Sequence, residues 1–179
     1  MTALTREGLL VELVSPDGAP TGSATVATAH SAPGQLHRAF SVHLLDGAGR
    51  LLLQRRAETK TRFPLRWANA CCGHPAPGQS VVSAATARLA DELGLVGVDL
   101  TEVGVYAYRA GDPATGLVEH EYDHVLLGIV DAASVRLKPD PAEVASLRWI
   151  EPTDLRADII ANPLSYAPWL DGVTQLALP

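Results

Sequence analysis

The chain has 179 residues, of which 47% are apolar and 19% charged, and a formal net charge of −6 at pH 7. This length and apolar content predict one folded domain over residues 1–179 and exclude a disordered chain. The acidic balance argues against nucleic acid as a partner, because binding to a phosphate backbone draws on clustered Lys and Arg.

Membranes and disulfides are also disfavoured. No run approaches the roughly 18 consecutive apolar residues of a membrane span, and the N-terminus lacks the long apolar segment of a signal peptide. Only Cys71 and Cys72 occur, and adjacent cysteines rarely bond to each other because the closure is strained. We therefore expect a soluble cytoplasmic protein, acting as a monomer in a reducing compartment with no membrane partner.

The first third of the chain reads as short strands and turns. Residues 9–15 alternate like a strand, and residues 16–22 have the Pro and Gly density of a loop. Two apolar-rich segments, 37–45 and 50–56, flank a turn at 46–49 that contains two glycines. This arrangement predicts a β-hairpin.

Helical and strand patterns follow one another in the rest of the chain. Apolar residues recur at helical spacing over 80–95, with Gly94 available as the C-terminal stop. Strands are predicted at 102–108, 117–130 and 146–150, with the loop GDPATG between the first two. A helix then opens at EPTDLRADIIANP, with Thr153 or Asp154 near its start, and a last helix is predicted over 165–176. Mixed strands with a few helices predict an α/β or α+β class, with helices packed around a mixed sheet.

Histidines and paired acids are the first candidates for chemistry. His30, His37 and His74 occupy loop-like or strand-entry positions, although singly each such residue is more often an ordinary surface or core histidine. Glu119 and Glu121 are two apart on a predicted strand and therefore project from one face. That face is either a solvated edge or a buried metal or catalytic site, and the apolar run that follows favours burial. The five side chains offer nitrogen and oxygen ligands suited to Mn²⁺, Zn²⁺, Fe²⁺ or Mg²⁺.

Two other features are open to a functional or a plain structural interpretation. Cys72 lies in CCGHP, where a tight turn next to His74 could tune its thiol, but a buried inert cysteine is commoner. Five basic residues crowd into twelve positions of this acidic chain, which fits either an anion site or a solvated loop. They are Arg55, Arg56, Lys60, Arg62 and Arg66.

Several motifs together resemble one family, the type I isopentenyl-diphosphate isomerases, which are relatives of the Nudix hydrolases. The matching segments, in the family's order, are TAHSAPGQLHRAFSVHLLD, LLLQRRAETK, WANACCGHP, RLADELGL, YAYRAGDPATGLVEHE and APW, and they cover about residues 20–170. The resemblance implies a Nudix-like mixed sheet flanked by helices. It also implies metal-dependent interconversion of isopentenyl and dimethylallyl diphosphate by proton transfer, without an organic cofactor.

The resemblance also implies roles for individual residues. A first metal, Mn²⁺, Zn²⁺ or Mg²⁺, would be held by His30, His37, His74, Glu119 and Glu121, and Glu92 would help to hold a Mg²⁺ ion that arrives with the diphosphate. Cys72 and Glu121 would be the acid and base, in an order that the sequence leaves open, with Tyr108 hydrogen-bonded to Glu121. Contacts to substrate would come from Arg56, Lys60, Arg88 and Trp169. Without the resemblance, Trp169 reads as a core anchor and Tyr108 as an ordinary strand aromatic.

Other positions depart from the family or from its hydrolase relatives. Gln79, Ala87 and Arg88 stand where Nudix hydrolases carry the Glu, Arg and catalytic Glu of their helix signature, which disfavours phosphoanhydride hydrolysis. Val26 replaces a Lys that isomerases usually carry, and many isomerases have Glu in place of Gln79. The alternatives are thus a paralogue that protonates or cyclises another prenyl diphosphate, a Nudix hydrolase, and a non-catalytic diphosphate-binding protein.

Overall fold

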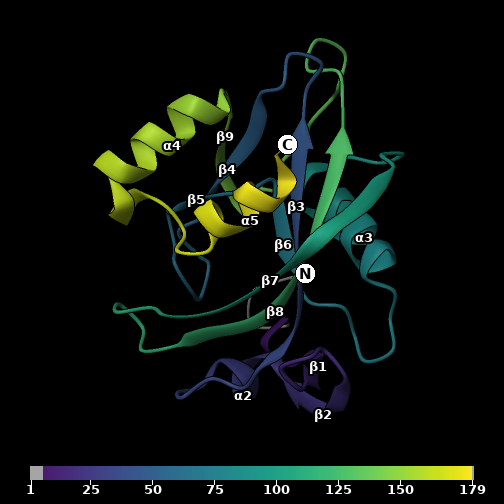
Figure 1. The fold of residues 1–179 in the computed structure, drawn as a ribbon, viewed down its shortest axis with the longest axis vertical. Helices are drawn as coiled ribbons and strands as arrows, with labels where there is room; N and C mark the ends of the chain where they lie inside the picture. The colour runs from purple at the N-terminus through teal and green to yellow at the C-terminus, as the bar shows by residue number, and fades with distance from the viewer. Residues whose placement is uncertain (1–5, 179) are drawn as a thin grey trace.

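The strands of the molecule form one mixed sheet. The computed structural model describes residues 6–178, and its strands are β1 (Leu10–Val14), β2 (Pro20–Thr25), β3 (His37–Leu45), β4 (Leu51–Arg56), β5 (Trp67–Ala68), β6 (Cys71–Gly73), β7 (Leu100–Gly111), β8 (Val118–Ile129) and β9 (Val144–Ile150). They belong to one nine-stranded sheet. Figure 1 shows how the labelled strands are arranged. The mixed sheet expected from the sequence is confirmed.

Strand β3 lies at the centre of this sheet. It pairs in parallel with β8 along its whole length and antiparallel with β6, while β7 extends the sheet beyond β8. Nearly all of its residues are buried, as expected for a strand covered on both faces. The hairpin predicted for 37–56 is therefore wrong in its pairing, since β3 and β4 share only the Leu45–Leu51 pair and β4 instead pairs with β9 and β5.

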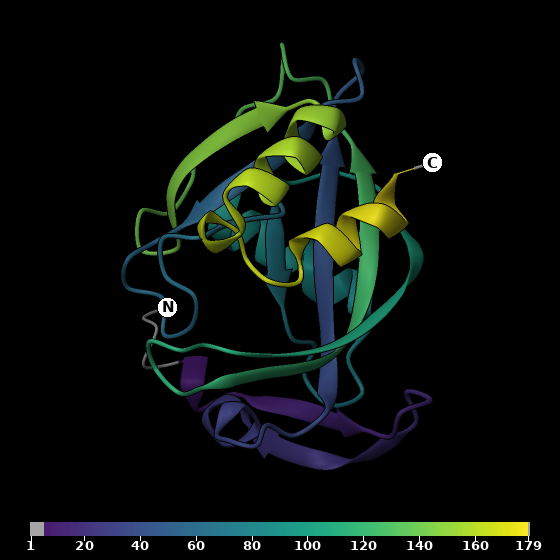
Figure 2. The same ribbon diagram turned by 60° about the vertical axis from the view of Figure 1, so that its left-hand side comes forward.

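Helices cover the two faces of the sheet. Helix α3 (Val81–Leu93) packs Ala85, Leu89 and Leu93 against one face of β3, and α5 (Leu170–Ala177) covers the other through Val173 and Ala177. Figure 2 shows α4 (Pro152–Ala161) and α5 on the same side of the sheet. Alternation along the strands decides which residues face which helix.

The residues at the ends of the helices can be compared with the helix boundaries predicted from the sequence. Helix α3 starts after Ser80, whose hydroxyl accepts from Ser83 N, and stops at Gly94, whose φ of 62° is left-handed. Helix α4 begins at Pro152 after Glu151, so Thr153 and Asp154 fall in its first turn without capping it. The C-terminal helix is shorter than predicted, because a 3₁₀ turn (Pro163–Ser165) and extended residues precede α5.

Two N-terminal features differ from expectation. Part of the predicted loop 16–22 belongs to β2, which pairs with β1, and the five-residue helix α2 (Val26–His30) was not predicted. Thr25 caps α2 by accepting from Thr28 N, and Val26 and Ala29 bury it against Val11. Within residues 6–178, no helix is long and apolar enough to cross a membrane.

We predict that Leu89→Ala lowers the free energy of unfolding by about 2–5 kcal/mol, because Leu89 is 2% exposed between α3 and the sheet. Val82→Ala on the outer face of the same helix is the control and should cost about 0.5 kcal/mol or less, since Val82 is 39% exposed. Urea unfolding of the metal-free protein measures both. Equal losses would contradict this packing.

Candidate active site

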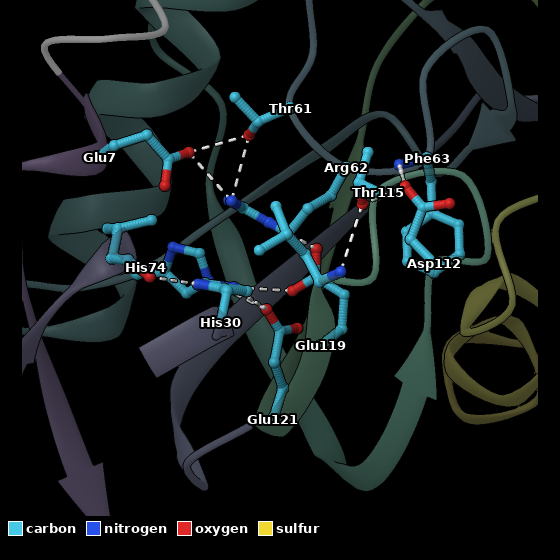
Figure 3. A network of polar contacts seen from close by, with 12 residues as sticks. Glu7, His30, Thr61, Arg62, Phe63, His74, Asp112, Thr115, Glu119 and Glu121 are labelled. Carbon is cyan, nitrogen blue, oxygen red and sulfur yellow. Dashed lines mark hydrogen bonds and ion pairs between the residues drawn. The ribbon is translucent and has the colours of Figure 1, made fainter. Parts of the chain in front are cut away.

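Five predicted ligand side chains converge on one point. His30 ends α2, His37 begins β3, His74 follows β6, and Glu119 and Glu121 come from β8. One ligand atom from each lies within 4.8 Å of every other. Figure 3 shows His30, His74 and both glutamates directed at the same space. The structure thus brings together the whole set that the sequence singled out.

The histidine tautomers fit a metal ion. Nδ1 of His30 lies 2.7 Å from Val26 O, and Nδ1 of His37 lies 2.7 Å from Gln35 O. A carbonyl can only accept, so each Nδ1 carries a hydrogen and Nε2 is the ring atom left to face the cluster, where its lone pair can bind a metal ion in the neutral form of the ring. Both Nε2 atoms and Glu119 Oε2 are buried without a well-formed hydrogen bond, although His30 Nε2 lies 2.8 Å from Glu119 Oε2. These unsatisfied atoms are suited to bind a divalent cation.

Electrostatics within the cluster keep its carboxylates ionised. Burial alone would raise the pKa of Glu121, but the imidazoles of His37 and His74 outweigh it and hold that pKa well below its usual range. Burial lowers the pKa of His74 to about 4, so its ring is neutral at neutral pH. Burial and the Glu121 charge would raise the pKa of Glu119, but His30 and Arg62 hold it below normal.

A thiol and a phenol face the same cavity as the cluster. Alternation in β6 sends Cys71 into the core under α3 and Cys72 toward the α5 side, where its Sγ donates to Asn69 Oδ1 at 3.1 Å. Burial, reinforced by Asp123, raises the pKa of the Cys72 thiol to about 12. The Tyr108 hydroxyl donates to Glu121 Oε2 at 2.7 Å.

The cavity has a volume of about 620 Å³, within the range of small-molecule sites. Cys72, Tyr108, Glu121 and Trp169 all line it. Trp169 is 3% exposed and packs against Tyr108, with ring centroids 5.9 Å apart. A thiol, a carboxylate, a phenol and an indole ring therefore line one cavity.

Cations line the opposite part of the cavity and are paired with acids. Lys60 and Arg88 both form ion pairs with Glu92 of α3 and with Glu143, which precedes β9. Arg56 also lines the cavity, with its Cζ atom 5.5 Å from the centre of the Trp169 ring. Gln54 Nε2 donates to Glu92 Oε2 at 3.1 Å. The structure therefore brings Arg56, Lys60 and Arg88 to the cavity, while Glu92 is buried beside it and contacts Lys60 and Arg88.

Some candidate residues lie elsewhere. Arg55 is exposed and Arg66 donates to Tyr166 O, so only part of the basic cluster faces the cavity. The other three histidines contact residues outside the cluster. Those contacts are His43 with Thr174, His120 with Gly34 O and His124 with Glu102 and Arg38.

Sequence reasoning missed two charged residues of the site. Arg62 is 9% exposed and joins Glu119 to Glu7, donating to them at 3.1 and 2.9 Å (Figure 3). Its place in the basic cluster was a weak signal. Glu143 is 4% exposed and pairs with Arg6 as well as with Lys60 and Arg88, but it stands in the unremarkable segment DPAEV. No local pattern marked it.

Known proteins match this chain in sequence and in fold. Residues 35–171 match the model of the NUDIX domain. The isopentenyl-diphosphate Delta-isomerase of Nocardia farcinica is 60% identical over 93% of each chain, and that of Streptomyces coelicolor is 48% identical over 98% of this chain and 86% of its own. The chain belongs to this isomerase family.

Solved structures with low sequence identity share the isomerase-family fold. DR0079 from Deinococcus radiodurans superposes with a TM-score of 0.73 at 17% identity, over 93% of this chain and 98% of its own. A MutT protein from Methanosarcina mazei gives 0.60 at 14% identity, over 79% of this chain and 92% of its own. The Nudix fold expected from the sequence is confirmed.

We predict that Mn²⁺ or Zn²⁺ at about 100 times its Kd raises the melting temperature of the metal-stripped protein by about 5–10 °C, because ligand at that concentration stabilises the folded state by ~2.7 kcal/mol. His74→Ala removes a ligand and should abolish most of this rise. His120→Ala, outside the cluster, should keep it. Differential scanning fluorimetry with and without metal decides, and an undiminished rise in His74→Ala would contradict the ligand set.

The raised pKa of Cys72 predicts that its thiol stays protonated between pH 7 and pH 9.5. In metal-free protein, alkylation of Cys72 by iodoacetamide should therefore speed up about tenfold per pH unit from pH 7 to 9.5 without a plateau. Urea-unfolded protein is the control and should level off near pH ~8.5. Mass spectrometry separates Cys72 from Cys71. A plateau near pH 8 in the folded protein would show an ordinary thiol.

Proposed function

We propose that this chain converts isopentenyl diphosphate into dimethylallyl diphosphate by moving the carbon–carbon double bond. Its curated relatives, at 60% and 48% identity, bear the name of that reaction. The observation that carries the proposal is the shared cavity of Cys72 and Glu121, one protonated and one ionised. A double-bond shift needs one group that gives a proton and one that takes a proton.

These protonation states favour one direction for the two transfers. The Cys72 thiol delivers its proton to the terminal methylene carbon, which leaves positive charge on the branched carbon. The Glu121 carboxylate then takes a proton from the carbon nearer the diphosphate, and the new double bond forms there. Tyr108, which donates to Glu121 Oε2 at 2.7 Å, orients that carboxylate and can pass its proton onward. The reverse reaction exchanges the two roles.

The cationic state needs a dry, electron-rich environment. Trp169 offers its ring face to the cavity, and an aromatic face stabilises a nearby cation by about 0.5–2 kcal/mol. Phe63 and Tyr108 pack beside that ring, and Tyr108 also lines the cavity. Exclusion of water protects the cation from capture, which would give an alcohol in place of the alkene.

Two divalent cations complete the proposed site. His30, His37, His74, Glu119 and Glu121 would hold one, with Mn²⁺, Zn²⁺ and Mg²⁺ as the candidate ions. Bound there, the ion would supply positive charge that fixes and polarises the two carboxylates. Glu92 would hold a Mg²⁺ ion that arrives with the diphosphate, while Arg56, Lys60 and Arg88 contact the diphosphate oxygens. No organic cofactor has a role in this chemistry.

The residues at the catalytic positions of the Nudix hydrolases disfavour hydrolysis. Arg88 stands at the position of the hydrolases' catalytic Glu and forms ion pairs with Glu92 and Glu143. Gln79 accepts from Ala76 N in an exposed turn, and Ala87 carries no charge. A hydrolytic magnesium cluster would need several acids on this helix face. Val26 gives the cavity an apolar wall in place of a cation.

The test is incubation of metal-loaded protein with Mg²⁺ and isopentenyl diphosphate in deuterated water. We expect dimethylallyl diphosphate with carbon-bound deuterium, seen by NMR and mass spectrometry. Cys72→Ala should lower the rate by at least about 100-fold, because it removes the proton donor. Cys71→Ala is the matched control and should stay within about threefold, since Cys71 is buried under α3, away from the cavity.

The outcomes separate the alternatives. Isomerisation that survives Cys72→Ala would refute the assigned acid. No product from metal-loaded wild type would refute the isomerase, and a cyclised product from a longer prenyl diphosphate would then favour the paralogue. Release of inorganic phosphate would favour a hydrolase.

A further inference from the structure

Asn69 lies behind the proposed acid and has no role in the chemistry described above. It stands between β5 and β6 and is fully buried, at 0% exposure. Its side chain makes four polar contacts, two through nitrogen and two through oxygen. A buried amide whose two donor and two acceptor positions are all hydrogen-bonded is held in one orientation.

The partners of Asn69 fix which way its amide points. Nδ2 donates to Val42 O at 3.2 Å and to Cys71 O at 2.8 Å, and backbone carbonyls can only accept. The indole nitrogen of Trp169 can only donate, and it lies 3.1 Å from Oδ1. If the amide were flipped, Oδ1 would face two backbone carbonyl oxygens and Nδ2 would face the indole N–H, so none of these hydrogen bonds could form. Oδ1 therefore points toward the cavity wall.

That one oxygen joins two groups of the proposed reaction. It accepts from Cys72 Sγ at 3.1 Å and from Trp169 Nε1 at 3.1 Å. The other polar neighbour of the thiol, Ser41 Oγ, is farther away at 3.6 Å. Without Asn69, the sulfur could rotate about its single side-chain bond and the indole would lose its polar anchor. The positions of the thiol and the indole ring relative to each other would then no longer be fixed by a common hydrogen-bond acceptor.

We infer that Asn69 is a positioning residue that holds the Cys72 thiol and the Trp169 ring in a fixed arrangement around the same reacting carbon atoms. This inference rests on the proposed function. Proton transfer to carbon depends steeply on the position of the donor, and cation stabilisation depends on the placement of the ring. Asn69 does not line the cavity and acts through these two side chains.

The experiment uses Asn69→Leu, which keeps the volume, and Asn69→Ala, in metal-loaded full-length protein with isopentenyl diphosphate. We expect kcat to fall about 10- to 100-fold while KM stays within about threefold, because the diphosphate contacts are untouched. Alkylation of Cys72 at fixed pH should become at least about threefold faster, as the thiol gains freedom. The Trp169 indole resonance, assigned with Trp169→Phe, should shift in ¹H–¹⁵N spectra, while those of Trp67 and Trp149 stay in place.

Leu89→Ala controls for a loss of stability alone. It weakens the core under α3 without touching Asn69, so kcat of the folded fraction should stay within about twofold of wild type and the Trp169 resonance should not move. The inference is overturned if kcat in the Asn69 variants also stays within twofold. It is equally overturned if kcat falls while the indole resonance and the Cys72 alkylation rate are unchanged, because Asn69 would then only support the backbone.

A wild-type measurement covers variants that fail to fold. The Trp169 indole hydrogen should exchange with solvent at least about tenfold more slowly than in urea-unfolded protein, and unprotected exchange would overturn the hydrogen bond. Wild-type turnover is measured first. Its absence refutes the proposed function and this role with it, whereas an active wild type with unaffected Asn69 variants refutes the role of Asn69 alone.

Discussion

The parallel pairing of β3 with β8 is the constraint on which the site depends. Its register places His37 opposite Glu121, and the same alternation aims Glu119 and Glu121 at the α5 side of the sheet. A shift of one residue would turn the glutamates into the apolar core under α3. Because β3 and β8 are both covered by helices, the buried residues that follow His37 and Glu121 along these strands fix that register. Core packing thereby determines the geometry of the candidate metal ligands.

This register has an energetic consequence. Two carboxylates, 5% and 8% exposed, lie side by side with imidazoles and with one guanidinium, that of Arg62. Buried charges cost free energy unless they are paired, and here two carboxylates share one site, with Glu119 Oε2 only 2.8 Å from His30 Nε2 but without a well-formed hydrogen bond. A divalent cation bound among these side chains would offset the repulsion between the carboxylates and would add to the stability of the folded protein.

Local sequence signals were enough for some parts of the molecule and not for others. The 3.6-residue period of α3 and the two-residue period of β8 can be recognised within a short stretch of sequence. Both elements and the pair of glutamates could therefore be predicted. Strand pairing is tertiary, so the turn at 46–49 was visible while the separation of β3 from β4 was not. Helix α2 is too short to show a period and exists because Thr25 caps it and Val11 covers it. The importance of Glu143 and Asn69 could not be predicted, because it depends on their contacts in the fold. Glu143 pairs with Lys60, which is distant in sequence. Asn69 contacts the distant Trp169 and also Cys72 of β6.

Charge distribution explains how an acidic chain can hold an acidic ligand. The chain carries a net charge of −6, and beyond about 8–10 Å such charge is largely screened at physiological salt. Inside the cavity the local balance decides, and there Lys60 and Arg88 are held by Glu92 and Glu143. These pairs keep the cations neutralised and pre-oriented before any ligand arrives. A diphosphate entering with Mg²⁺ would exchange partners within this network, the ion taking Glu92 and the phosphate oxygens taking the cations, so that no charge is left unpaired in the buried site.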